Sequence, residues 1–277
     1  MDDMARRVGL IRDLSSRLGH LLAGLSREAW TRPSACALWA VREVVAHLIG
    51  GAERQMQSMV RGRKGDAAPP PGFAPLDVAA LSASNAQRDM ALRERLGETL
   101  LDAFVTQYDR LGHLLARFDP GDWDTRCWHA RRGAMPARAY VDLRIQELAI
   151  HDWDIRAAFE PAPHLAPESL PILVHMTPTW LGMSFRPGPR LAAPVLYRFH
   201  VTGAAPSSPE VVVTGEAFQV RPVAPAKADV ALYCDAATSL LFLYGRVPAA
   251  RDVTAGRWAI DGDLGLLERF AQWFKGL

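Results

Sequence analysis

One segment of the sequence predicts both a helix and a set of ligands on it: Arg144-Ile145-Gln146-Glu147-Leu148-Ala149-Ile150-His151-Asp152-Trp153-Asp154. Glu147 and His151 are four residues apart, so on a helix they project from one face, one turn above the other. Asp154 follows three residues later on the same side. A carboxylate and an imidazole at this spacing can bind one metal ion, although the same spacing also occurs in ordinary solvated helical pairs.

His47 is a third candidate ligand, and it lies in an apolar stretch of another predicted helix. Alone, such a residue is equally well explained as a core histidine bonded to a carbonyl. The helices of a small bundle, however, can bring inward-facing side chains together around a metal. His47, Glu147 and His151 would then form the two-histidine, one-glutamate set that is typical of catalytic zinc and leaves a fourth position open.

The surrounding residues 1–160 show the three- and four-residue spacing of apolar side chains that is typical of amphipathic helices. We expect helices at about 8–25, 39–60, 76–118 and 137–159, with a bend possible at Gly97. The intervening segments 62–75 and 119–136 are rich in Pro, Gly and polar residues and are expected to be loops. Four helices with two long connections predict an antiparallel bundle.

Residues 161–277 have a different texture and predict a smaller α+β domain. We expect one helix at 168–185 interrupted by Pro171 and Pro178, a helix capped by Asp235 that runs to Tyr244, and a terminal helix at 264–274. Short β-rich runs predict strands at 195–201, 211–214, 218–220, 230–233 and 258–260. The predicted fold class is therefore α plus α+β.

Composition narrows the class of protein. The 277 residues are 49% apolar and 22% charged with a net charge of +2, and no basic block suggests nucleic-acid binding. No apolar run is long enough to span a bilayer, and the N-terminus lacks the pattern of a signal peptide. Cys36, Cys127 and Cys234 are far apart, which argues against a disulfide framework or a cysteine zinc site and favours a reducing cytoplasmic location.

The chain also resembles a known family. The run Trp39-Ala40-Val41-Arg42-Glu43-Val44-Val45-Ala46-His47-Leu48 resembles the W-x-V-x-D-x-V-x-H-L signature of mycothiol-dependent maleylpyruvate isomerase-like proteins, with Glu43 where Asp is usual. These proteins belong to the DinB-like metal-binding superfamily. The segment from Glu147 to Asp154 is similar to the family's E-x-x-x-H-x-x-D element. Near the C-terminus, residues 240–246 and 260–263 resemble its L-x-G-R and G-D elements.

The resemblance implies a DinB-like four-helix bundle at 1–160 and a smaller α+β domain at 161–277. It implies that His47, Glu147 and His151 hold a divalent metal, for which zinc is suitable and nickel is an alternative. Relatives use the metal to activate mycothiol, a small thiol that adds to an electrophilic substrate. The expected partners are therefore a small-molecule thiol and an electrophile, and the expected reaction is isomerisation or S-transfer.

Two further residues receive candidate roles. Arg246 is the candidate catalytic residue of the second domain, where its guanidinium would hold a substrate carboxylate or stabilise an enolate. Capping of the preceding helix is the alternative explanation for Arg246. Asp154 is a candidate partner that orients His151, and an exposed or capping carboxylate is the alternative. We expect substrate specificity to lie in loops 62–75 and 119–136.

Two other functions remain open at this point. A DinB-like hydrolase would use bound water in place of a thiol, and a non-catalytic metal- or ligand-binding protein would keep the bundle without turnover. The three-ligand set argues against the second, because a decayed site tends to lose a ligand first. The electrophile, the metal and the oligomeric state leave no readable trace in the sequence.

Overall fold

The computed structural model describes residues 3–73, 78–247 and 258–275. The chain forms two compact units that divide between Ser169 and Leu170, whereas the sequence analysis placed the division at 160/161. Residues 161–169 belong to the first unit because they are tied back to its helices. Trp153 Nε1 donates to Pro163 O at 3.0 Å, and Arg17 pairs with Glu168 at 3.3 Å.

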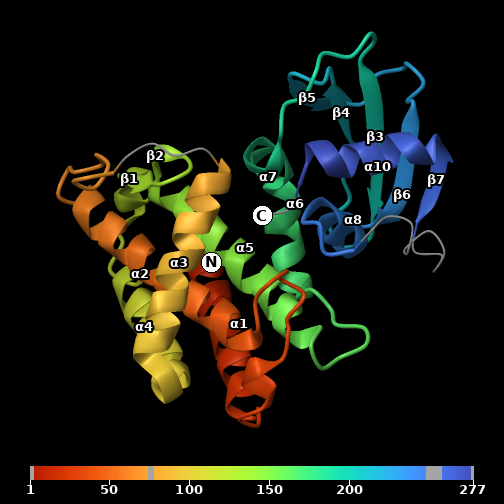
Figure 1. Cartoon of the computed structure of the whole chain (residues 1–277). Helices are drawn as coiled ribbons and strands as arrows, with labels where there is room; N and C mark the ends of the chain where they lie inside the picture. The colour runs from red at the N-terminus through yellow and green to blue at the C-terminus, as the bar shows by residue number, and fades with distance from the viewer. Residues whose placement is uncertain (1–2, 74–77, 248–257, 276–277) are drawn as a thin grey trace. The chain divides into compact units, whose positions relative to one another are not determined.

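The first unit is helical (Figure 1). Its bundle consists of α1 (Asp3–Ala23), α2 (Val41–Gly62), α4 (Leu100–Leu115) and α5 (Ala137–Arg156). Helix α3 (Val78–Leu96) packs against α2. Four short 3₁₀ helices join these elements: η1 (Ala29–Thr31), η2 (Gly97–Thr99), η3 (Pro120–Asp124) and η4 (Pro167–Ser169).

Helix α2 shows how the local sequence sets an element that carries the site. Ala40 is extended, and its backbone N–H donates to the Glu43 carboxylate at 3.0 Å, which satisfies a donor at the helix start. Val44, Val45 and Leu48 are fully buried on one face of the helix. The apolar spacing read from the sequence is therefore the spacing of the bundle core.

The prediction of one long helix at 76–118 was wrong within the described residues. Helix α3 ends at Leu96, and α4 starts after the single 3₁₀ turn of η2. Gly97 has φ of +51°, a left-handed conformation that glycine adopts without a steric penalty and that ends a helix. The predicted helix start at Leu76 and the predicted loop end at Pro75 lie outside the described residues.

The prediction of a continuous loop at 119–136 was also wrong. This segment contains η3 and an antiparallel hairpin of β1 (Arg126–His129) and β2 (Gly133–Pro136). The strands are too short to show a period-two pattern in the sequence. The hairpin packs against α2.

The second unit contains a five-stranded sheet in the order β5-β4-β3-β6-β7. The strands are β3 (Val195–Thr202), β4 (Pro209–Val213), β5 (Phe218–Pro222), β6 (Val230–Asp235) and β7 (Ala259–Gly262). Of the strand pairs in the described residues, β3 and β6 are parallel, with Phe199 opposite Leu232, and the others are antiparallel. The mixed sheet with helices confirms the predicted fold class.

Among the described residues, the helices that accompany this sheet are α6 (Leu170–His175), α7 (Thr177–Ser184), α8 (Ala236–Leu243) and α10 (Leu264–Trp273). Asp235 caps α8 as predicted, since its carboxylate accepts from Thr238 N at 2.7 Å. The helix expected at 168–185 is instead η4, α6 and α7. Pro171 and Pro178 each lie in the first turn of a helix, where a missing N–H costs nothing.

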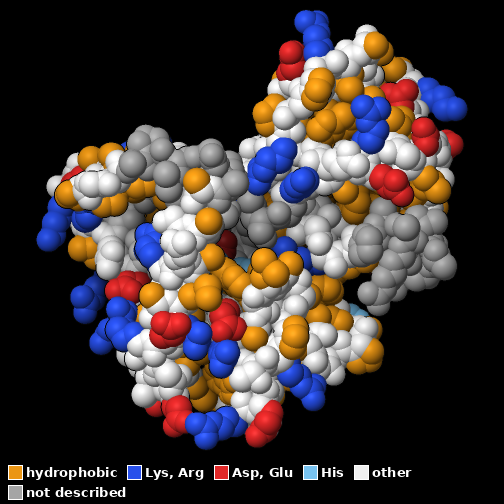
Figure 2. All heavy atoms as spheres, viewed as in Figure 1, with side chains coloured by type: hydrophobic (Ala, Val, Ile, Leu, Met, Phe, Trp, Pro, Cys, Tyr) orange, Lys and Arg blue, Asp and Glu red, His pale blue; other side chains and the backbone are white. Residues whose placement is uncertain are grey.

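Surface character agrees with the near-neutral charge. On the face of the bundle shown in Figure 2, Lys and Arg side chains alternate with Asp and Glu, and no block of one sign stands out. Across the described residues, every helix falls short of the combined length and apolar character that crossing a bilayer requires.

The end of α2 provides a test of this packing. A Cβ added at Gly62 would clash with the backbone oxygen of Arg126 and would lie 3.0 Å from Cys127 Sγ. We expect Gly62→Ala to destabilise the bundle by about 1–3 kcal/mol through overpacking. The urea-unfolding midpoint measures this change. Gly112→Ala in α4 is the matched control, because a Cβ there has nothing within 4 Å, and equal midpoints for the two variants would contradict the α2–hairpin contact.

Candidate metal site

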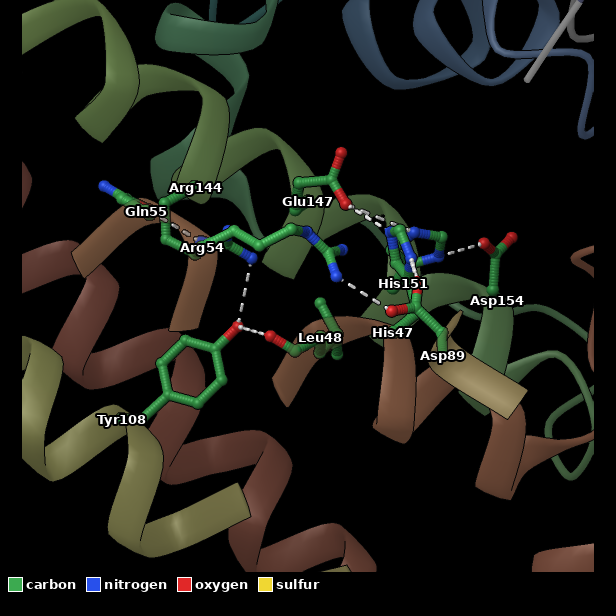
Figure 3. Close-up of polar contacts among 10 residues, drawn as sticks. All are labelled: His47, Leu48, Arg54, Gln55, Asp89, Tyr108, Arg144, Glu147, His151 and Asp154. Carbon is green, nitrogen blue, oxygen red and sulfur yellow. Dashed lines mark hydrogen bonds and ion pairs between the residues drawn. The ribbon is translucent and has the colours of Figure 1, made fainter. Parts of the chain in front are cut away.

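The three candidate ligands converge inside the bundle (Figure 3). His47 Nε2 lies 2.8 Å from Glu147 Oε2, and His151 Nε2 lies 3.6 Å from the same oxygen. One ligand atom from each residue falls within 4.8 Å of the others. The sequence-predicted set is therefore brought together by two helices, with His47 from α2 and the other two residues from α5.

The spacing of residues on α5 brings two of the three candidate ligands together. Glu147 and His151 are one turn apart on one face of the helix, and α5 packs against α2. The His47 and His151 rings meet edge to face with centroids 5.1 Å apart. Trp39, at the start of the His47 segment, lies with its ring centroid 5.1 Å from that of His47 and so limits the movement of that imidazole.

A carboxylate holds the outer nitrogen of each histidine. His151 Nδ1 lies 2.9 Å from Asp154 Oδ2, and His47 Nδ1 lies 2.7 Å from Asp89 Oδ2. When Nδ1 carries the proton and donates it to a carboxylate, Nε2 presents its lone pair inward. This is the arrangement that metal-binding histidines commonly show.

Asp154 is the partner that the sequence analysis named, but Asp89 is a residue that it missed. Asp89 lies on α3 and is 2% exposed. Its second oxygen, Oδ1, accepts from Arg54 Nη1 at 3.0 Å. No helical spacing links Asp89 to His47, because the two residues lie on different helices. The feature that marks Asp89 as a partner of His47 is the burial of its carboxylate, which only the folded structure shows.

The electrostatics of the cluster suit a cation. Burial alone would raise the pKa of the Glu147 carboxyl, but hydrogen bonds from His151 and His47 outweigh burial and hold that pKa well below its ordinary value. Burial alone would lower the pKa of His151, but hydrogen bonds to Asp154 and Glu147 raise it to about 9. Burial also opposes ionisation of Asp89, whose pKa is nevertheless lowered by His47 and Arg54.

These residues fit a divalent metal. They are two imidazole nitrogens and one carboxylate oxygen, and the carboxylate already stabilises positive charge between the rings. The Glu147 side chain is 32% exposed, whereas those of His47 and His151 are 17% and 10% exposed. The ligand set can therefore be reached from the side on which Glu147 lies, and three protein ligands leave a coordination position for a small molecule.

The cysteines occupy different settings. Burial raises the pKa of the Cys127 thiol to about 11, so this side chain does not supply a thiolate at neutral pH. Cys36 is half-buried and groups with His151 and Asp154 within 4.8 Å. This second group shares His151 with the first and contains one histidine in place of two.

Arg246 lies in the second unit, just after α8. Its Nη1 donates to the carbonyl oxygen of Tyr244 at 2.9 Å, a backbone contact of the kind that the capping alternative implies. Gly245, between them, has φ of +70°. This contact of Arg246 lies inside the second unit. A role of Arg246 in binding a substrate stays a prediction.

Comparison with known proteins gives the family. The model of the mycothiol maleylpyruvate isomerase N-terminal domain matches residues 11–156, which include His47, Glu147, His151 and Asp154. Among curated proteins, no sequence matches significantly.

Solved structures show the same fold. The crystal structure of a mycothiol-dependent maleylpyruvate isomerase is similar with a TM-score of 0.64 and 16% identity, covering 89% of this chain and 90% of that one. A histidine-to-alanine mutant of that isomerase matches with the same values. At this identity the likeness concerns the fold alone. Because the family model covers just over half of the 277 residues, the chain belongs to the mycothiol maleylpyruvate isomerase N-terminal domain family.

Proposed function

We propose that this protein is a metal-dependent enzyme that activates a low-molecular-weight thiol, mycothiol, for addition to an electrophilic small molecule. The reaction would be an isomerisation or an S-transfer. The observation that carries the proposal is the convergence of His47, Glu147 and His151, a three-ligand set that would leave one coordination position of a bound ion open. Family membership supports a thiol as the second ligand, since the family takes its name from a mycothiol-dependent isomerase.

In this proposal His47, Glu147 and His151 hold a divalent ion, for which zinc is the first candidate and nickel the second. When bound, the ion supplies a Lewis acid that favours the deprotonated form of a thiol, whose free pKa is about 8.5. Asp89 and Asp154 keep the two imidazole rings in the tautomer that presents Nε2 to the ion.

The remaining steps are the addition of the thiolate to the substrate and the binding of the substrate by a residue of the second unit. A thiolate that adds to a conjugated double bond allows rotation, and its departure gives the isomer. Where it stays on the product, the reaction is an S-transfer. We propose Arg246 for the substrate, because a guanidinium can hold a carboxylate through two parallel hydrogen bonds or stabilise a developing enolate.

The metal site is tested by metal content. Purified wild-type protein should contain about one equivalent of zinc or another divalent metal by mass spectrometry, in accord with a single three-ligand site. We expect His47→Ala, Glu147→Ala and His151→Ala each to lose most of it while the helical circular dichroism stays largely intact. His113→Ala, at an exposed position of α4, should keep its metal, and full metal content in all three ligand variants would refute the site.

Asp89 provides a second test. Asp89→Asn keeps the shape of the side chain but removes the charge that faces His47 Nδ1, so we expect zinc affinity to fall about 10- to 100-fold. Competition with a coloured chelator measures this affinity. The matched control is Asp102→Asn, because Asp102 is exposed in the first turn of α4. Equal affinities for the two variants would mean that Asp89 does not hold the ring.

Turnover tests the reaction itself. Metal-loaded protein should convert members of a panel of conjugated electrophiles only when mycothiol is present, and it should consume the thiol only in the transferase case. Arg246→Ala should lower turnover by about 10-fold or more and leave the metal content unchanged. Turnover without thiol would indicate a metal-dependent hydrolase, and a loaded protein with no turnover on any electrophile would indicate a binding protein.

A further inference from the structure

A second buried polar group lies beside the ligands and has no part in holding them. Arg144 on α5 is 4% exposed. Its Nε donates to Gln55 Oε1 at 2.9 Å, and its Nη1 lies 3.5 Å from Tyr108 Oη. Figure 3 shows this group next to the metal ligands, linking α2, α4 and α5.

The hydrogen-bond partners of Arg144 are neutral. In the part of the chain that the structure describes, no carboxylate lies within ion-pair distance of its guanidinium. Leaving a charge buried without an ionic partner costs folding free energy. A neutral side chain could bridge Gln55 and Tyr108 at a lower cost, so the positive charge is the feature that needs an explanation.

The chain makes room for this charge at one place. A Cβ added at Gly51 would lie 3.0 Å from both Nη1 and Nη2 of Arg144. The guanidinium therefore lies against the backbone of α2, one helical turn after His47. The neighbouring charge that favours it is Glu147, three residues further along the same face of α5, and attraction to Tyr108 and Glu147 outweighs burial and holds the pKa of Arg144 above its ordinary value.

The charged side chains of this hydrogen-bonded network are among the residues drawn in Figure 3. Three carboxylates, those of Glu147, Asp89 and Asp154, face two guanidiniums, those of Arg54 and Arg144. Together they carry a single negative charge. A divalent ion in this set would leave one net positive charge, and that positive charge would vanish without Arg144.

We propose that Arg144 determines the class of the fourth ligand: its buried positive charge, which has no carboxylate within ion-pair distance among the described residues, makes the site select one anionic ligand over a neutral one. This inference rests on the metal site of the proposed function and goes beyond it by naming the residue that sets the charge of the ligand. Arg144 does not touch the ligand set. It acts through the low-dielectric interior, where charges interact more strongly than in water.

The test compares an anionic and a neutral probe on the cobalt-loaded protein, whose visible absorption reports the fourth ligand. We expect Arg144→Met to weaken azide binding about tenfold, because one unit of nearby buried charge is lost. Imidazole binding should stay unchanged. Arg144→Lys keeps the charge and should bind azide within about threefold of the wild type.

Arg138→Met is the matched control. It removes a positive charge from the same helix, but at a side chain that is 50% exposed, so azide affinity should not change. Wild-type azide affinity in Arg144→Met would overturn the proposal. Equal weakening of azide and imidazole would also overturn it, because that result indicates a purely structural role.

Two further outcomes are distinguishable. If Arg144→Met does not fold, Gly51→Ala displaces the guanidinium without deleting it, and azide should weaken while imidazole does not; unchanged azide binding in that variant would overturn the proposal. A wild-type protein that binds no cobalt would remove the metal site and both proposals with it. If the protein binds cobalt and Arg144→Met has the azide affinity of the wild type, only the role of Arg144 is overturned.

Discussion

The contact between α2 and α5 is the constraint on which the candidate site depends. Glu147 and His151 share a face of α5 through local spacing, but His47 reaches them only because the buried face of α2 packs against α5. The resulting 2.8 Å approach of His47 to Glu147 joins two segments that are far apart in the sequence. Any ion at this site would therefore link the two helices, and binding would be coupled to the stability of the bundle.

Two adjacent glycines on α2 keep this contact close. A Cβ at Gly50 would lie 2.7 Å from Asp89 Oδ1 and 2.9 Å from Arg54 Nη1, and one at Gly51 would meet the guanidinium of Arg144. One glycine thus makes room for the carboxylate that holds His47, and the next makes room for the buried charge beside Glu147. Gly50 and Gly51 lie about one helical turn after His47. The helix that supplies a candidate ligand therefore also leaves space for the groups that surround that ligand.

The break at Gly97 has a consequence for the same site. Because α3 and α4 are separate helices, α3 can pack on α2 while α4 packs on both α1 and α2. Asp89 lies on α3, and its carboxylate reaches His47 Nδ1. A glycine that seemed to concern only helix length therefore affects the orientation of a ligand 50 positions away in the sequence.

The sequence by itself determined α1, α2 and α5 of the bundle, the mixed character of the second half and the identity of the three candidate ligands. These features follow from local spacing, or from motifs in which neighbours along the chain share a face. It could not reveal Asp89, the hairpin at 126–136 or the burial of Arg144 against neutral hydrogen-bond partners. Each of these features depends on burial and on contacts between residues that are distant in the chain. Only the tertiary structure decides which distant residues pack against one another and become shielded from water.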